Sequence, residues 1–337
     1  MSDISAQKPV GASFLKPLLG AWSWIFLLAI LVFFELYARA ETGQTFLFRV
    51  YNIQSIAIAA SQILLLALGL TLVIVAGHID LSIGFTTGLS AVVMALVIRV
   101  AGPDSGWGIV ILAMLVGTFA AVIVGLVNGW LVAILNVPSF IGTLGTYGVA
   151  RGGALIVAGG ATVSIRSDEA RAFGNGDILG FPVPVVVAAV LAFLCHYLLA
   201  HTRFGVHTYA LGANRASVER AGVDVKKHLI WLFVISAVTA GVGGLVYTGR
   251  FSAGAANAGE PILLYAVAAV FIGGASLTGG QGTITGTVIG AFIIAVIQFG
   301  LVFSGLPPYW QFVAVGLVII VAVLVDQSRD KLTGAQS

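Results

Sequence analysis

The chain alternates long apolar runs with short polar turns. Ten runs approach or exceed the roughly 20 apolar residues that an α-helix needs to cross a bilayer. Turn-forming residues close them, as in Asn136-Val137-Pro138 and Leu306-Pro307-Pro308. We therefore predict an all-α polytopic membrane protein with one transmembrane domain over residues 21–326, between tails at 1–20 and 327–337. The predicted spans are 20–39, 52–76, 82–100, 107–135, 139–158, 182–200, 229–249, 262–278, 284–303 and 308–326.

Composition also indicates residence in a bilayer. Hydrophobic residues make up 59% of the chain and charged residues 9%, whereas soluble domains carry about 25% charged residues. The first apolar run is longer than the roughly 7–15 residues of a signal-peptide core, so we predict an uncleaved span there. The single cysteine, Cys195, excludes an internal disulfide. No run of Lys and Arg exceeds two residues, which disfavours a nucleic-acid partner.

The positions of Lys and Arg predict the orientation. With ten spans, both termini lie on one side, and that side also holds the 201–228 loop with its five Lys and Arg residues. Because cytoplasmic loops carry an excess of Lys and Arg, we predict that both termini and this loop are cytoplasmic. The 159–181 loop is then periplasmic.

Two polar turns interrupt the apolar pattern in similar ways. The run AGHIDLSIG at 76–84 places Asp80 and Ser82 between two spans, and GGASLTGG at 273–280 follows a later span. A charge such as Asp80 is tolerated there only at the membrane edge or beside a wet cavity. We predict a weak internal repeat, with a coincidence of two glycine-rich turns as the alternative.

Arg151, inside the fifth span, must snorkel, pair or face water, or else that segment is re-entrant.

The 201–228 loop contains a short helix with both ends marked. Asn214 is suited to capping its start, Gly222 to ending it, and Asp224 to capping the next span. A helix of about two turns is unstable alone in water. It therefore either docks on a partner or packs on its own bundle.

The motifs of an enzyme are missing from the sequence. None of the five lysines follows a glycine, so no phosphate-binding Gly-Lys-Ser/Thr loop exists, and no His-Glu-x-x-His or Gly-x-Ser-x-Gly motif occurs. We predict no catalytic residue, no cofactor and no metal site. Polar residues within or next to the spans are instead candidates for a solute path or gate, with interhelical hydrogen bonding as the alternative. They are Asp80, Ser82, Asn128, Thr143, Thr146, Arg151 and Gln298.

Several of these motifs together resemble one transporter family. The run at 76–84, NVPSFIGTLGT at 136–146, Ala150-Arg151-Gly152, TRFG at 202–205, YALGAN at 209–214 and FIGGAS at 271–276 are similar to the ribose/xylose-type permeases of ABC importers. The resemblance covers about 45–326. It implies a homodimer in the bacterial inner membrane that imports a monosaccharide or polyol. It also implies a periplasmic sugar-binding protein and a cytoplasmic ATPase with two fused nucleotide-binding halves, which would bind ATP and Mg.

In this family the 205–224 loop is the element that couples the permease to its ATPase. The resemblance therefore implies coupling roles for Gly205, Asn214, Arg215, Glu219, Arg220 and Gly222. It places Asp80 and Ser82 at the cytoplasmic end of the path. Two alternatives stay open: a secondary carrier or facilitator that works without an ATPase, and an ABC permease for amino acids.

Overall fold

The computed structural model describes residues 22–103 and 106–333, so the predicted tail at 1–20 lies outside it. Within the described residues the backbone is predominantly helical. The helices are α2 (Trp22–Thr42), α3 (Val50–Val75), α4 (Ile83–Ala101), α5 (Trp107–Ala133), α6 (Ser139–Ala158), α7 (Asp168–Asn175), α8 (Val183–His201), α9 (Arg203–Ala213), α10 (Arg215–Arg220), α11 (Val225–Phe251), α12 (Glu260–Ile272), α13 (Ile284–Phe303) and α14 (Trp310–Thr333). Antiparallel pairs join strand β1 (Val163–Ser164) to β4 (Ala253–Gly254) and β2 (Asp177–Ile178) to β3 (Phe181–Pro182).

Most of the predicted spans are present as long apolar helices. Among the described residues, eight helices are long and apolar enough to cross a membrane: α2 to α6, α8, α11 and α13. This confirms an all-α polytopic membrane protein. The predicted run 262–278 is helical only to Ile272, because Gly273 and Gly274 begin a turn. The apolar part of α14 covers Trp310–Val321, and the helix continues into the predicted tail at 327–337. A total of ten spans therefore stays a prediction.

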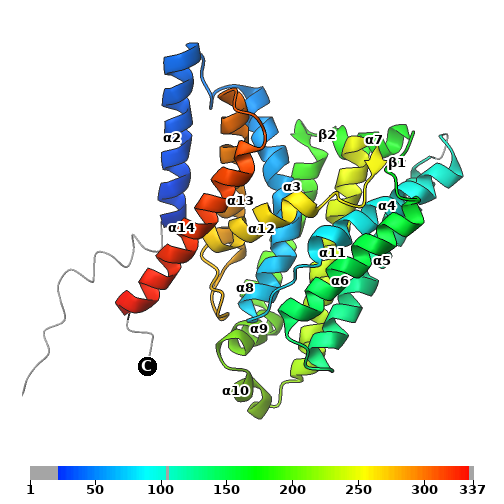
Figure 1. Cartoon of the computed structure of the whole chain (residues 1–337), viewed down its shortest axis with the longest axis vertical. Helices are drawn as coiled ribbons and strands as arrows, with labels where there is room; N and C mark the ends of the chain where they lie inside the picture. The colour runs from blue at the N-terminus through cyan, green and yellow to red at the C-terminus, as the bar shows by residue number, and fades with distance from the viewer. Residues whose placement is uncertain (1–21, 104–105, 334–337) are drawn as a thin grey trace, which may run out of the picture.

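Helices α3 and α11 form the centre of the bundle. Most of the side chains in each are buried, and α11 packs against α3, α4 and α5. Helix α2 packs on α13 at the periphery and is mostly exposed. Figure 1 shows α9 and α10 at one end of the bundle and α7, β1 and β2 at the other. The two long loops therefore lie at opposite ends, as the predicted topology requires.

Small residues allow α5 to lie close to its neighbours. Gly117, Ala121, Gly125 and Gly129 are buried at every fourth position, which places them on one face of the helix. A methyl group on Gly125 would lie 2.6 Å from the carbonyl oxygen of Phe233 in α11. This spacing is the small-xxx-small pattern that brings helix backbones together in lipid, where no hydrophobic force acts between helices.

One buried charge has a structural role in α2. The Glu35 carboxylate accepts hydrogen bonds from Arg39 Nε at 2.6 Å, from the Thr45 hydroxyl at 3.0 Å, and from the backbone amides of Phe46 and Leu47 at 2.8 and 2.9 Å. These bonds satisfy its oxygens and fix the connection between α2 and α3. Glu35 is thus a loop anchor rather than part of a solute path.

We expect Gly125→Val to destabilise the bundle, because the added atoms would overlap α11 and force it away from α5. Overpacking of this kind costs about 1–3 kcal/mol. Thermal unfolding of the detergent-solubilised protein measures the loss. The control is Gly108→Val in the same helix, where a methyl group meets nothing within 4 Å. Equal unfolding temperatures for the two variants would contradict the close approach of α5 and α11.

Candidate functional site

Asp80 lies in the turn between α3 and α4 and is only 1% exposed. Its Oδ1 accepts hydrogen bonds from the Ser82 amide at 3.0 Å and the Ser82 hydroxyl at 2.6 Å. Its Oδ2 accepts a bond from the Ser236 hydroxyl of α11 at 2.8 Å. Burial raises the pKa of Asp80, and the bonds from Ser82 and Ser236 act in the opposite direction. Oδ1 therefore bonds within the turn, and Oδ2 ties the turn to α11.

The network continues from this turn into α5 and α6. Asn128 donates from Nδ2 to the Ser82 hydroxyl at 2.8 Å, and the Thr146 hydroxyl donates to Asn128 Oδ1 at 2.5 Å. The Thr143 hydroxyl accepts a bond from the Leu81 amide at 3.1 Å. Five of the predicted path or gate residues thus lie together: Asp80, Ser82, Asn128, Thr143 and Thr146. In this conformation the side chains of Asp80, Ser82, Asn128 and Thr146 bond to one another and Thr143 bonds to the backbone of the turn, so they hold the turn in place.

The two similar turns share one local structure. After α3, the Gly77 amide bonds to Ile74 O and the His78 amide to Val73 O. After α12, the Gly274 amide bonds to Phe271 O and the Ala275 amide to Val270 O. Gly77 and Gly274 both have positive φ, at 79° and 87°. This is the Schellman ending of a helix in both places. The shared motif explains the similarity that the sequence shows, while common ancestry stays a prediction.

These turns meet each other and α9. The Gly280 amide donates to Val75 O at 2.8 Å, and a methyl group on Gly279 would lie 2.7 Å from Gly77 Cα. Gly212 of α9 fits between them, because a methyl group there would overlap Val75 O and the Gly280 amide. We call Gly77, Gly212, Gly279 and Gly280 the glycine junction. Three segments far apart in sequence are in backbone contact there.

The predicted short helix of the 201–228 loop is α10. The Asn214 side chain caps it by accepting from the Ser217 amide at 3.0 Å, Gly222 has a φ of 80°, and Asp224 caps α11 through the Lys227 amide. Gly205 lies where α9 folds back on α8, and a side chain there would overlap Leu199 O. These predicted helix boundaries are confirmed.

The charged residues of α10 lie at the surface. Arg215 Nε pairs with Glu219 at 2.9 Å, and Arg220 bonds to the Ser217 hydroxyl at 3.2 Å, while Val218 is the buried residue of this helix. Burial and the positive charge of Arg215 lower the pKa of His78 to about 4.

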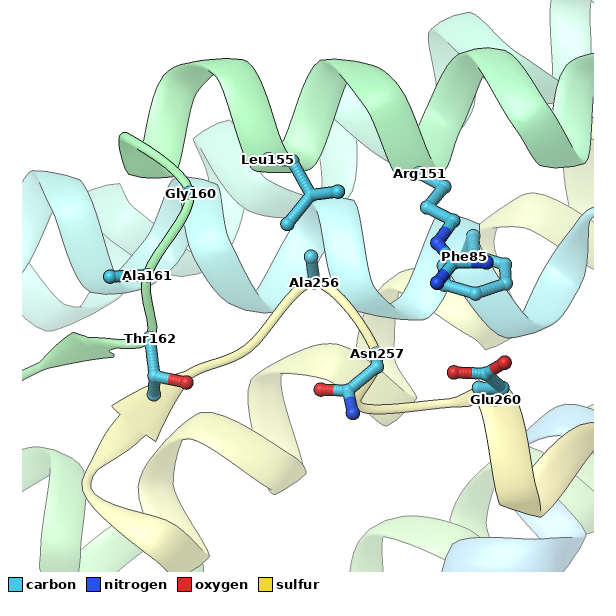
Figure 2. Close-up of a pocket in the computed structure, with 9 residues that line it drawn as sticks. All are labelled: Phe85, Arg151, Leu155, Gly160, Ala161, Thr162, Ala256, Asn257 and Glu260. Carbon is cyan, nitrogen blue, oxygen red and sulfur yellow. The ribbon is translucent and has the colours of Figure 1, made fainter.

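Arg151 lies apart from the Asp80 network and borders a pocket of about 250 Å³. The segment that contains it, α6, is one continuous helix. Its guanidinium lies 5.0 Å above the ring of Phe85 in α4. Figure 2 shows the Arg151 side chain from α6 and the Glu260 carboxylate from the start of α12 extending toward the same part of the pocket. Thr162 and Asn257 also line this pocket.

Gln298 is separate from both groups. It lies in α13, which packs on α2, α3, α8, α12 and α14, whereas the network involves α4, α5, α6 and α11, and Gln298 does not line the pocket. Its side-chain Nε2 is buried without a hydrogen-bond partner among the described residues. The structure does not place Gln298 with the other candidates.

Sequence reasoning missed Ser236 and three residues of the pocket, Thr162, Asn257 and Glu260. Ser236 is an ordinary residue of an apolar helix, and only the folded structure places it against Asp80. Glu260 carried a usable signal, since it is a lone acid between Gly259 and Pro261 at the start of an apolar run. Because the predicted span begins at residue 262, Glu260 is not among the predicted site residues.

Comparisons with known proteins agree over most of the chain. The family described as "Branched-chain amino acid transport system / permease component" matches residues 52–323. The xylose transport system permease protein of Haemophilus influenzae is 31% identical over 91% of this chain and 96% of its own length. The ribose import permease protein of Escherichia coli K12 is 34% identical over 90% and 93%, and the D-allose transport system permease protein of the same strain is 36% identical over 83% and 84%. No solved structure matches the chain.

We expect Ser236→Ala to weaken the packing of the turn between α3 and α4, since Asp80 Oδ2 loses its hydrogen-bond donor and stays buried. An unsatisfied buried acceptor costs about 1–3 kcal/mol, more than the average of about 0.6 kcal/mol for interhelical hydrogen bonds in membranes. Thermal unfolding in detergent measures the effect. Ser61→Ala is the matched control, because this equally buried hydroxyl bonds only to Ile58 O in its own helix. A smaller loss for Ser236→Ala than for Ser61→Ala would contradict the anchoring role.

Proposed function

Because the chain belongs to the family of branched-chain amino acid transport system permease components, a multi-pass family of the bacterial inner membrane, we propose that it carries a monosaccharide inward as the permease subunit of an ABC importer. One observation supports this substrate class above others. Relatives named for xylose, ribose and allose are similar to this chain over most of both lengths. A ribose-like sugar or a related polyol is the proposed solute.

We propose that ATP hydrolysis by a separate cytoplasmic ATPase with two fused nucleotide-binding halves drives this transport. Helix α10 supports this assignment, since it projects from one end of the bundle with Glu219 and Arg220 exposed. The preceding helix, α9, reaches the glycine junction, and Tyr209 donates a hydrogen bond to Gly282 O at 2.7 Å. A push on α10 would therefore reach both turns through backbone contacts. ATP and Mg would bind to the ATPase and not to this chain.

The proposed assembly contains two copies of this chain and a periplasmic sugar-binding protein. A charge within a membrane-spanning helix supports the second copy. Arg151 of α6 is exposed in a single chain, although a charge facing lipid costs about 2.5–3.5 kcal/mol on insertion scales. A dimer that encloses a water-filled path between its subunits would keep this group away from lipid.

An amino-acid substrate is the second candidate, because the family description names branched-chain amino acids. Within the described residues Arg151 and Glu260 form no salt bridge, and a guanidinium and a carboxylate beside one pocket are compatible with the carboxylate and ammonium of such a solute. The names of the relatives favour a sugar. Direct measurement of uptake separates the two.

The first test is the purification of the tagged chain from its native membrane in mild detergent, with identification of its partners and reconstitution into liposomes. We expect an ATPase to copurify and ATP-dependent uptake of D-ribose, D-xylose or D-allose when the binding protein is present. Uptake of leucine without uptake of any sugar would overturn the substrate class. Transport by the chain alone without ATP would indicate a facilitator.

We expect Arg215→Glu combined with Arg220→Glu to release the ATPase, because the substitutions reverse the charge of the surface that α10 presents. Copurification measures ATPase binding, and membrane insertion should be unchanged. The control carries Arg49→Glu and Arg99→Glu, two exposed arginines on the predicted opposite side. Normal ATPase binding and uptake by the α10 variant would remove the docking assignment.

A further inference from the structure

The pocket beside Arg151 contains charged groups that the bundle itself does not use. Within the described parts of the chain, neither the Arg151 guanidinium nor the Glu260 carboxylate is in a salt bridge. Arg151 lies inside α6, a helix long and apolar enough to span the membrane. Intramembrane charges that bond to no other side chain are costly and face water or a solute. The Glu35 and Asp80 carboxylates, which are satisfied by hydrogen bonds, show that this chain anchors its structural charges differently.

The position of Arg151 is fixed by an aromatic platform. Phe85 is fully buried, and its ring contacts Tyr147 edge to face with centroids 4.4 Å apart. The Arg151 guanidinium lies over that ring at 5.0 Å. A cation–π contact orients the planar group but uses none of its five N–H donors. These donors are left for a ligand in the pocket.

The other lining groups complete a set suited to hydroxyl groups. Glu260 contributes acceptors, and Asn257 and Thr162 contribute both donors and acceptors. Leu155 and Ala256 add apolar surface. Each sugar hydroxyl both donates and accepts, and neighbouring hydroxyls fit the paired atoms of guanidinium, carboxylate and amide groups. The pocket volume of about 250 Å³ is just below the range of about 300–1,000 Å³ for drug-sized ligands, which suits a smaller molecule.

The location of the pocket connects it with the Asp80 network. Thr162 immediately precedes β1, and Asn257 follows β4, so the pocket lies next to the pair of strands at the predicted periplasmic end. Phe85 lies in the first turn of α4, and Ser82 immediately precedes this helix. A ligand that moves Arg151 or Phe85 would thus act on the helix whose start belongs to the buried network.

We propose that Arg151, Asn257, Glu260 and Thr162 form a subsite that binds a monosaccharide during its passage through the permease. This proposal rests on the proposed function. It differs from the amino-acid alternative in what it requires of the charges. A neutral sugar needs hydrogen-bonding atoms at Glu260, whereas a zwitterionic amino acid needs the negative charge itself.

Uptake by the complete importer in proteoliposomes tests this requirement. We expect Glu260→Ala to reduce the maximal rate of sugar uptake about 5- to 30-fold, the effect of one or two lost hydrogen bonds to the ligand. Glu260→Gln should keep most of the rate, since the amide can still bond to hydroxyl groups. Glu41→Gln and Arg99→Gln, at exposed positions away from the pocket, are the controls for loss of charge. A loss of uptake rate in Glu260→Gln as large as in Glu260→Ala would contradict a neutral sugar as the ligand of this subsite.

Thiol labelling tests occupancy of the pocket directly, by protection of a thiol and not by the rate of transport. Cys195→Ala removes the only cysteine of the chain, and Thr162→Cys then places a single thiol beside the pocket. We expect the transported sugar, delivered by the binding protein, to slow the reaction of this thiol with a methanethiosulfonate reagent. A thiol introduced by Glu41→Cys should react at the same rate with and without sugar.

The outcomes of these tests distinguish failure of the proposed transport function from failure of the proposed subsite. A wild-type importer that carries none of the three sugars overturns the proposed function. Sugar uptake that works, with no protection of the Thr162→Cys thiol and no effect of Glu260→Ala, overturns the subsite alone. Protection by leucine in place of the sugar would assign the pocket to an amino acid.

Discussion

The buried Asp80 carboxylate is the interaction on which the centre of this protein depends. A carboxylate that is 1% exposed is stable inside the bundle only when its oxygens have hydrogen-bond donors, and these come from the adjacent turn and from α11. Ser82 extends the network to Asn128 and Thr146. The turn, α5, α6 and α11 are thereby held in one arrangement. A movement of any of these segments must break bonds to a buried charge or carry the other segments along.

The glycine junction supplies a second kind of constraint, set by backbone contact rather than charge. At Gly77, Gly212 and Gly279 the chain segments approach closely enough that a methyl group at Gly212 or Gly279 would collide with a neighbouring backbone. Contacts without intervening side chains transmit displacement with little loss, since packed backbones have no rotamers to adjust. The junction joins α9 to the two turns, and the first of these turns holds Asp80. Helix α9 and the buried Asp80 network are therefore connected through the few residues of the glycine junction.

The charges within the bundle fall into two groups with different physical states. Glu35 and Asp80 have their oxygens bonded to donors of the chain itself, and their positions are determined by folding. Arg151 is held by a cation–π contact, Glu260 lies at the start of α12, and both face the same pocket. Burial with satisfied hydrogen bonds indicates a structural group, whereas Arg151 and Glu260 form no salt bridge within the described part of the chain.

The sequence by itself determined the membrane character, the positions of the long apolar helices, and the caps at Asn214, Gly222 and Asp224. These features depend on residues close together in the chain, through hydrophobic run length and local hydrogen bonding. Only the tertiary structure decided that Asp80 bonds to Ser236, that Gly212 lies between the two turns, that Gln298 lies apart, and that Glu260 lies beside the same pocket as Arg151. The contacts among these join residues far apart in the sequence, such as Asp80 with Ser236, and in helices that are apolar on nearly every face the sequence pattern does not reveal which face meets which neighbour.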